Sequence, residues 1–233
     1  MFSRYSVSIG TKNKREMVLL KSRPCAWGKC AFCDYIHDNS TSEEENFELN
    51  STVLDKVTGK YGALEVINSA SVFELDNKTL AKSKEVCTNK NINLLYFESY
   101  YHYKNRLDEI RDFFNIPIIF KCGIETFDND FRTKVLNKGF TIESVEEVRH
   151  YFDSVCLLVG IKGQTREQIS NDINILLQNF EYGCVNVFCN NSTPIKADPE
   201  LIDWFDKTYG DILRKHPNID YLYNNTDFGV GEI

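Results

Sequence analysis

The amino-acid sequence predicts an α/β fold, and the architecture that matches it best is a partial, six-unit (β/α) barrel. Strand-like and helix-like segments alternate along all 233 residues. The expected strands are mostly continuous apolar runs, which is typical of parallel strands buried on both faces. Six such strands can be counted, whereas a complete eight-unit barrel typically takes ~250 residues. A doubly wound open sheet also fits the alternation, but the partial barrel is the better match.

In the first half of the chain, apolar runs and capping signals place three strands and three helices. An apolar run at 17–20 is the first strand. An acidic stretch at 42–48 then precedes a helix at 49–60, with Asn50 or Ser51 as its N-cap and Gly59 near its end. A strand at 64–68, a polar helix at 76–90, a buried strand at 92–97 and an amphipathic helix at 106–114 follow.

The second half repeats this order. We expect strands at 117–122, 155–161 and 185–188, and helices at 128–136, 142–152 and 166–180. Asp198 and Pro199 open a further helix at 199–209, since proline is favoured in the first helical turn. The tail at 217–233 is left unassigned. No linker, repeat or charge block divides the chain, so we expect one domain over residues 1–233.

Composition and charge exclude several classes of protein. The chain is 42% hydrophobic and 26% charged, which excludes collagen-like and wholly disordered proteins. Its net charge of −7 argues against tight nucleic-acid binding, which usually requires a basic surplus. No apolar run approaches the ~20 residues of a membrane span, and residues 1–10 lack the apolar core of a signal peptide. We therefore expect a cytoplasmic protein with no membrane partner, whose 8 Cys do not form a disulfide framework.

Three cysteines follow the first predicted strand with the spacing Cys-x4-Cys-x2-Cys, at Cys25, Cys30 and Cys33. Three thiolates bound to a four-iron cluster leave one iron open for a ligand that is not protein. Zinc is the alternative, because His37 would complete a closed Cys₃His site. A third interpretation, three buried thiols without a metal, fits least well with so many cysteines in one loop. Spacing alone favours iron over zinc.

This loop resembles the cluster loop of radical S-adenosylmethionine (SAM) enzymes. Their usual spacing is Cys-x3-Cys-x2-Cys with an aromatic residue before the last cysteine, and Phe32 stands there in this chain, with Tyr35 close by. The chain departs from the pattern by one extra residue between Cys25 and Cys30. The resemblance implies a [4Fe-4S] cluster held by the three cysteines, and a partial (β/α)6 TIM-like barrel of the radical SAM type.

Other segments at predicted strand ends agree with the resemblance, over a core of about residues 16–195 with an extension at 196–233. Ser69 and Ser71 stand where that superfamily binds the amino group of SAM, although it has glycines there. Glu125 follows Gly123 in a segment that looks like the Gly-Ile/Leu-Glu-Ser/Thr signature. The turn with Gly160 and Lys162 resembles the one that holds the adenine. Each has a simpler interpretation: Ser69 and Ser71 form a turn, Glu125 caps the helix near Asp128, and Gly160 is an ordinary turn glycine.

The resemblance also implies the chemistry. The open iron would bind the amino and carboxylate groups of SAM, and one electron from a donor such as flavodoxin or ferredoxin would cleave SAM to methionine and a 5′-deoxyadenosyl radical. That radical would abstract a hydrogen atom from the substrate. Candidates for substrate contact or catalysis are Glu98 after the third strand and Lys121 on the fourth, with Asn190 and Asn191 after the sixth. A carboxylate such as Glu98 suits a substrate with N–H donors.

The segment at 125–140 and the one at 68–73 look like those of the archaeosine synthase-related branch, which is associated with modified tRNA bases and 7-deazaguanines. The acidic charge favours a free base over tRNA as the substrate. A compact family that fits is the queuine lyases, which cleave queuine to 7-aminomethyl-7-deazaguanine. We therefore expect queuine or a related 7-deazaguanine as the substrate. A tRNA-modifying enzyme, a glycyl-radical activase and a zinc-stabilised binding module without catalysis are the alternatives.

Overall fold

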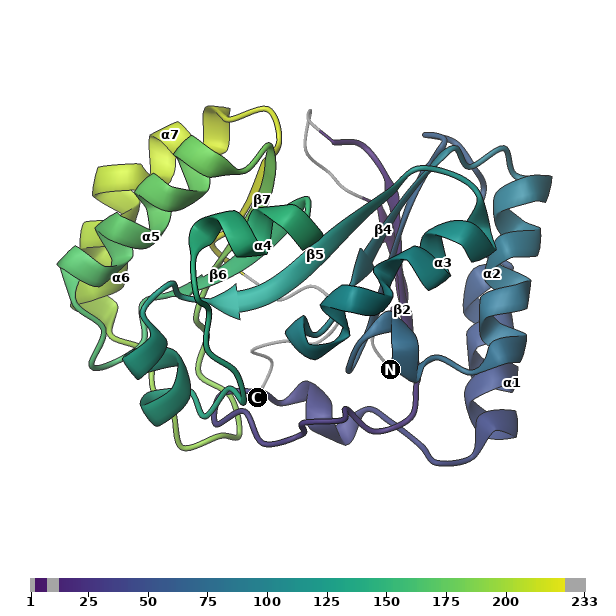
Figure 1. Ribbon diagram of the computed structural model, residues 1–233, viewed down its shortest axis with the longest axis horizontal. Helices are drawn as coiled ribbons and strands as arrows, with labels where there is room; N and C mark the ends of the chain where they lie inside the picture. Colours follow the sequence, from purple (N-terminus) through teal and green to yellow (C-terminus); the bar gives the residue numbers. More distant parts are fainter. Residues whose placement is uncertain (1–2, 8–12, 225–233) are drawn as a thin grey trace. The chain divides into compact units, whose positions relative to one another are not determined.

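The computed structural model describes residues 3–7 and 13–224 (Figure 1). These residues form two compact units, one within 1–28 and 35–120 and the other within 29–34 and 121–233. The division at 120 falls inside a strand, and residues 29–34 of the cysteine loop belong to the second unit although both flanking segments belong to the first. One domain over 1–233 stays a prediction.

The first unit consists of strands with helices between them. β2, β3 and β4 are parallel, each lying beside the strand that precedes it along the chain, and β1 pairs with β2 in the antiparallel direction. The elements are β1 (Tyr5–Val7), β2 (Glu16–Leu20), η1 (Tyr35–His37), α1 (Glu43–Leu54), β3 (Ala63–Asn68), η2 (Val72–Glu74), α2 (Asn77–Asn89), β4 (Leu94–Glu98), η3 (Tyr101–Arg106) and α3 (Leu107–Phe114).

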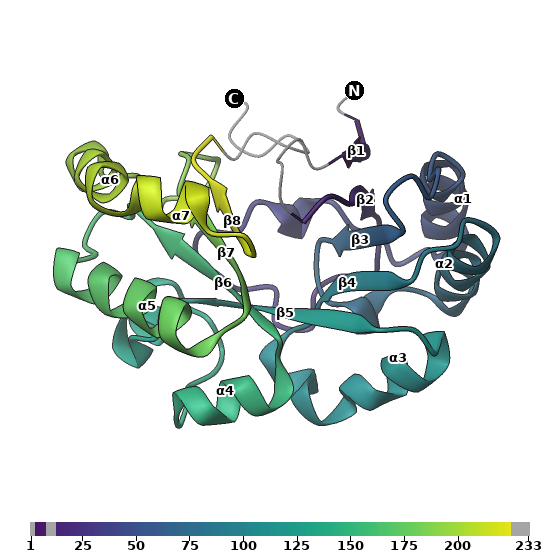
Figure 2. The ribbon, with the colours of Figure 1, turned by 90° about the horizontal axis from the view of Figure 1, so that it is seen from above.

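Helices α1, α2 and α3 cover one face of β2–β4 (Figure 2). The ring of Phe97 on β4 lies 5.2 Å from that of Phe114 on α3, so Phe97 points to the helix-covered face. Because side chains alternate along a strand, Glu98 points to the opposite face, together with Tyr96. The same reasoning holds for β5 (Ile118–Glu125), where Phe120 packs under Arg111 of α3 and Lys121 therefore points away from the helices.

Helix α1 begins and ends about six residues earlier than the sequence predicts. Ser42 is its N-cap and accepts a hydrogen bond from the N–H of Glu45, and the three glutamates of the first turn favour the positive end of the helix dipole. Asn50, which we expected at the N-cap, is buried in the middle of the helix. Its side chain bonds the N–H and the carbonyl of Lys21, both at 2.7 Å, and so fastens α1 to the end of β2.

The second unit also consists of parallel strands and covering helices. β5, β6, β7 and β8 pair in chain order, all parallel. Beyond β5 the elements are η4 (Phe131–Val135), α4 (Val145–Tyr151), β6 (Ser154–Val159), α5 (Arg166–Asn179), β7 (Tyr182–Val187), α6 (Pro199–Phe205), η5 (Asp206–Gly210), α7 (Asp211–Lys215) and β8 (Ile219–Leu222). The six predicted strands all form.

Two predicted elements of this unit differ clearly from the structure, and one strand forms where none was predicted. The predicted helix at 128–136 is a single π-helical turn, η4, because Asp128 caps it through the N–H of Phe131 at 2.8 Å and the chain then leaves the helix at Leu136. Strand β7 starts at Tyr182, three residues early, where Gly183 lets Leu176 of α5 pack directly on the strand. β8 forms inside the tail that we left unassigned, whose residues 225–233 lie outside the described part.

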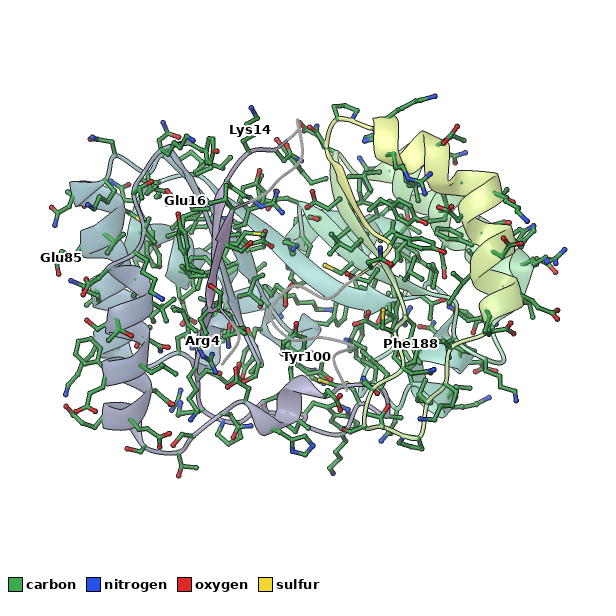
Figure 3. The ribbon with its side chains drawn as sticks, turned by 180° about the vertical axis from the view of Figure 1, so that it is seen from behind. Arg4, Lys14, Glu16, Glu85, Tyr100 and Phe188 are labelled. Carbon is green, nitrogen blue, oxygen red and sulfur yellow. The ribbon has the colours of Figure 1, made fainter. Side chains whose placement is uncertain are left out.

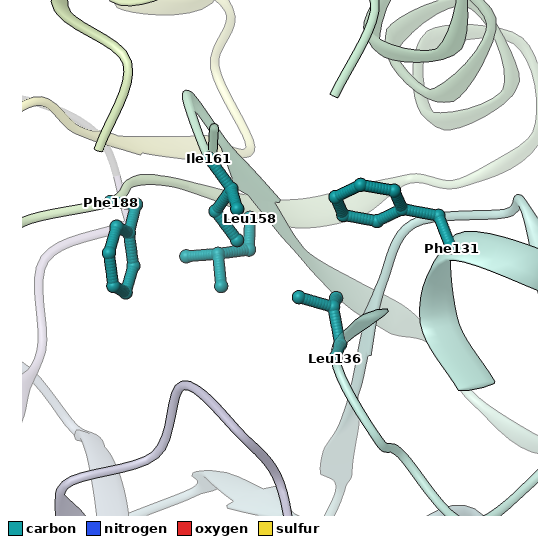
Figure 4. Packing of buried hydrophobic residues seen from close by; sticks show 5 residues of the cluster. All are labelled: Phe131, Leu136, Leu158, Ile161 and Phe188. Atoms are coloured by element: carbon teal, nitrogen blue, oxygen red, sulfur yellow. The ribbon is translucent and has the colours of Figure 1, made fainter. Parts of the chain in front are cut away.

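A hydrophobic cluster lies at the carboxyl ends of β6 and β7 (Figure 4). It contains Phe131, Leu136, Leu158, Ile161 and Phe188, all at most 7% exposed. Phe32 of the cysteine loop packs against this cluster with part of its ring. The aromatic residue before the last cysteine of the loop thus anchors that part of the loop to the second unit.

None of the helices in the described part of the chain combines the length and apolar character that a membrane crossing demands.

Candidate functional site

The three cysteines of the loop are distributed between the two units. Cys25 belongs to the first unit, and Cys30 and Cys33 belong to the second. All three are half-buried and belong to no disulfide. Within each unit, the described residues contain no three His, Cys, Asp or Glu side chains placed to hold a metal ion. His37, the fourth ligand of the zinc alternative, belongs to the first unit, whereas Cys30 and Cys33 belong to the second.

In the first unit, the buried carboxylate of Glu74 holds the chain on both sides of Cys25. Its two oxygens accept hydrogen bonds from the N–H of Ser71 at 2.9 Å and from the hydroxyl of Tyr103 at 2.6 Å, and the backbone N–H of Ala26 is a further donor. The Glu74 carbonyl accepts from the N–H of Arg23 at 3.1 Å. Burial raises the pKa of Glu74 despite these donors. Our sequence reasoning missed Glu74, although Ser71-x-x-Glu74 is a capping-box pattern.

The two serines after β3 differ in what they contact. Ser71 is fully buried and caps η2, and its hydroxyl lies 3.4 Å from that of Ser99 after β4. The hydroxyl of Ser69 is also buried, and it has no hydrogen-bond partner among the described residues. An unpaired buried hydroxyl costs stability unless a ligand completes it. Ser71 therefore caps the turn, and the contact of Ser69 and Ser71 with SAM stays a prediction.

In the second unit, several hydrogen bonds hold the remainder of the cysteine loop. The N–H of Ala31 donates to the Leu136 carbonyl at 2.9 Å, and the amide of Asn137 donates to the Lys29 carbonyl at 2.7 Å. Asn191 donates to the Phe32 carbonyl at 2.8 Å, and the N–H of Ser192 donates to Asp34 at 3.1 Å.

The side chains of Asn190 and Asn191 bond to neighbouring loops, and their contact with the substrate stays a prediction. The side chain of Asn191 is used to hold Phe32 and to accept from Thr193, and that of Asn190 accepts from the N–H of Ala197 at 2.9 Å. Both amides therefore stabilise loops of the unit.

At the end of β5, Glu125 forms a buried ion pair with Lys138. Their Oε1 and Nζ atoms are 2.6 Å apart, and each side chain is 9% exposed. Glu125 does not cap the next helix, because Asp128 does so. A Cβ atom at Gly123 would lie 2.8 Å from Glu125 Oε1, so a glycine is needed there to leave room for the pair.

Lys138 also places a positive charge beside the cysteine loop. Burial lowers its pKa, but the negative charges of Glu125 and Cys30 outweigh burial and raise it overall. The ammonium group lies 5.4 Å from the centre of the Phe32 ring. A positive charge near a cysteine favours the thiolate, the form that binds metal. Our sequence reasoning missed Lys138.

The turn after β6 is built by backbone hydrogen bonds. Gly160 has a φ of +85°, and a Cβ atom there would clash with Ile202 at 2.3 Å. The N–H of Lys162 donates to the Lys196 carbonyl at 2.8 Å, while its side chain is exposed. The turn is thus rigid at Gly160, and the contact of Gly160 and Lys162 with adenine stays a prediction.

The other candidates lie where the strand pattern placed them. Glu98 is half-buried at the end of β4, and Lys121 is 6% exposed on β5, both on the face away from the helices. Tyr35 begins η1 in the first unit and is half-buried. Their roles toward substrate or cofactor stay predictions.

Behind the Glu125 segment, α5 contributes a buried carboxylate, Asp172. It is 1% exposed and accepts from the N–H of Phe127 at 2.7 Å through Oδ1, whereas its Oδ2 has no hydrogen-bond partner among the described residues. Burial raises the pKa of Asp172 to about 6, against the lowering effects of Thr126, Phe127 and Arg132.

This raised pKa predicts how stability changes with pH. The native state holds the Asp172 proton more tightly than the unfolded chain, so the contribution of this group is fully present below its ordinary pKa of 3.8 and is lost as the pH rises through about 6. Asp172→Asn cannot ionise and keeps an oxygen for Phe127. We expect the variant to gain up to about 3 kcal/mol over the wild type between about pH 4 and pH 8. Urea unfolding of both proteins at the two pH values measures the difference between their free energies of unfolding. The same difference at both pH values would contradict the prediction.

The donor set fits the groups that the sequence resemblance implies. Three cysteines in one loop, none of them in a disulfide, suit an iron–sulfur cluster with an open iron. The unpaired Ser69 hydroxyl and the fixed Glu125 carboxylate are polar groups at strand ends, suited to the ammonium, hydroxyl and N–H groups of a nucleoside-like cofactor.

Comparison with known proteins gives a strong likeness. No family model matches the chain. An uncharacterized protein of Methanocaldococcus jannaschii is 25% identical over 199 residues, which are 74% of this chain and 54% of that protein, so the chain spans about half the length of this curated relative. A solved structure of a queuine lyase from Clostridium spiroforme, bound to SAM and queuine, is 51% identical, with a TM-score of 0.95 over 100% of both chains. The predicted partial (β/α)6 barrel of the radical SAM type is thereby confirmed.

Proposed function

The chain belongs to the queuine lyase family, and we propose from this that it cleaves queuine to 7-aminomethyl-7-deazaguanine as a radical SAM lyase. The observation that carries the proposal is the 51% identity over the full length of a queuine lyase bound to SAM and queuine. The cysteine loop and the strand-end residues that we identified from the sequence agree with it.

In this proposal, Cys25, Cys30 and Cys33 hold a [4Fe-4S] cluster, and SAM binds to the iron that has no cysteine. When bound, these groups supply the 5′-deoxyadenosyl radical that removes a hydrogen atom from the substrate. On the protein side, the hydroxyl of Ser69 accepts or donates a hydrogen bond at the polar end of SAM. Glu125, the turn with Gly160 and Lys162, and the aromatic residues Phe32 and Tyr35 surround the rest, with Ser71 holding the segment that carries Ser69.

Glu98 and Lys121 are the proposed contacts to the substrate. Both lie on strand faces that point away from the covering helices. Glu98 is at the carboxyl end of β4, where ligands bind in barrels of this kind, and Lys121 lies in the middle of β5. The base of queuine offers N–H donors to a carboxylate and a carbonyl oxygen to an ammonium group. Charge-assisted hydrogen bonds of these two kinds would orient the base.

The proposed function is tested by anaerobic reconstitution with iron and sulfide, followed by addition of SAM, dithionite and queuine. Both 5′-deoxyadenosine and 7-aminomethyl-7-deazaguanine are measured by mass. We expect both products in amounts that rise together. If only 5′-deoxyadenosine forms, the substrate assignment is wrong and the radical SAM assignment stands. A colourless protein that holds one zinc ion would overturn both.

The substrate contacts give a separate prediction. Glu98→Gln and Lys121→Met should each raise the KM for queuine by roughly 10–100-fold, since a hydrogen bond to a charged group contributes about 1.5–3 kcal/mol. SAM binding should not change. Glu109→Gln is a matched control, because Glu109 is an exposed glutamate of α3 that pairs with Arg106 at 2.8 Å. An unchanged KM in both substrate-site variants would remove these residues from the proposal.

The partners follow from the chemistry and the charge. One-electron reduction requires a donor, for which we propose a cytoplasmic flavodoxin or ferredoxin. The net charge of −7 favours the free base over tRNA. A gel shift with unmodified tRNA at low salt tests this point, and we expect no complex.

A further inference from the structure

Glu125 has an unusual backbone conformation. Its φ is +65°, in the left-handed region that non-glycine residues rarely adopt. The register between β5 and β6 also shifts between Gly123 and Glu125, so the strand bulges there. Such a conformation persists only where the surroundings hold it. In this chain, it aims the Glu125 carboxylate at Lys138.

Arg132 holds the backbone on both sides of Glu125. It lies in η4, is 0% exposed, and is the largest fully buried side chain of the described residues. Its Nε donates to the carbonyl of Ile124 at 3.1 Å and to that of Thr126 at 3.0 Å, and Nη2 also donates to Thr126. One guanidinium group thus fixes the peptide unit that precedes Glu125 and the one between Thr126 and Phe127.

Asp172 holds the peptide unit between Thr126 and Phe127 from its other end. Its Oδ1 accepts the N–H of Phe127 at 2.7 Å, and its carboxylate attracts Arg132 electrostatically. Two oppositely charged, fully buried side chains, from η4 and α5, therefore grip residues 124–127. Burial of two charges is costly.

We propose that Arg132 and Asp172 are positioning residues, together named the Glu125 clamp, which hold Glu125 in its left-handed conformation and thereby set the affinity for SAM. The link to SAM rests on the proposed function. The clamp itself rests on the contacts within the second unit. It accounts for two buried charges that the reaction does not otherwise use.

The test compares SAM affinity and local amide exchange in four variants of the reconstituted protein. Arg132→Lys keeps the charge but cannot reach both carbonyls, and Asp172→Ala removes the acceptor for Phe127. Both should weaken SAM binding about tenfold, the equivalent of one hydrogen bond, and speed exchange of the Thr126 and Phe127 amides. Asp172→Asn keeps the acceptor and should bind SAM within about twofold of the wild type.

Glu16→Ala is the matched control. Glu16, labelled in Figure 3, is a buried carboxylate at the start of β2 that accepts the N–H groups of Thr58 and Gly59, both at 2.7 Å. Its loss should lower Tm without changing SAM affinity or exchange near Glu125. A general loss of stability would instead weaken SAM binding in Glu16→Ala as well, which would overturn the proposal.

Two further results separate the clamp from the proposed function. If the wild type binds SAM and the clamp variants bind it equally well, the clamp proposal is wrong and the function stands. If the wild type binds no SAM, the function fails and the link to SAM fails with it. Amide exchange then still decides whether Arg132 and Asp172 hold residues 124–127.

Discussion

Replacing Lys138 with methionine is expected to lower the free energy of unfolding by about 3–5 kcal/mol, because it leaves the carboxylate of Glu125 buried without its partner. The pair is short, at 2.6 Å, and both side chains are 9% exposed. Water cannot replace the lost ammonium group at such a site, and methionine fills most of the vacated space. Urea unfolding of the metal-free protein measures the loss.

Two further variants separate charge burial from other effects of the Lys138 substitution. The double variant Lys138→Met, Glu125→Leu removes both charges and should recover most of the lost stability, since apolar pairs often replace buried ion pairs at little cost. Lys134→Met breaks an exposed pair with Asp130, 2.8 Å long, and should leave Tm unchanged. If Lys138→Met loses no more stability than Lys134→Met, the buried ion pair between Lys138 and Glu125 does not stabilise the fold as predicted.

The same pair shows what the sequence could not predict. Glu125 was identified because it ends a strand within a recognisable segment. Lys138 lies thirteen residues later, in irregular chain between η4 and α4. Its position depends on the bulge at Gly123 and on the π-helical turn, neither of which follows from hydrophobic periodicity. In the sequence, a lysine in such a segment cannot be distinguished from an exposed lysine.

The strands were predicted well for a physical reason. Parallel strands buried on both faces need long apolar runs, so β2–β7 could be located from these runs in the sequence. Helix ends were predicted less well. Asn50 fits an N-cap as well as Ser42 does, and only its contacts with Lys21 show that it lies inside α1.

Polar residues after strands were the least predictable. Ser69, Ser71, Asn190 and Asn191 are alike in the sequence, being small polar residues that follow an apolar run. In the structure, Ser69 alone of these four has a buried side-chain atom without a partner among the described residues. Hydrogen bonds to distant backbone, such as that from Asn191 to Phe32, decide which of them remain for a ligand.

Substitution of any one loop cysteine, Cys25, Cys30 or Cys33, by alanine is expected to abolish cluster binding and with it all formation of 5′-deoxyadenosine. A four-iron cluster with three cysteine ligands has no ligand to spare, and two thiolates hold it poorly. Iron content and brown colour after reconstitution measure the cluster, and the product assay measures the activity.

Two control variants make the cysteine result specific. Cys189→Ala removes a half-buried free thiol outside the loop and should leave iron content and product unchanged. His37→Ala removes the residue that a Cys₃His zinc site would need, and it should leave the cluster in place. Tm shows whether each variant still folds. We expect that it does, because Glu74 and Asn191, which also hold the loop, are left intact.

The pattern across the five variants decides between the two metals. Loss of iron in the three loop variants, with iron retained in Cys189→Ala and His37→Ala, fits a cluster with one open iron. Loss of metal in His37→Ala as well would indicate a closed four-ligand site, which offers no open position for SAM. In that case the radical mechanism would have no place to start, and the likeness to a lyase would extend to the fold without the chemistry.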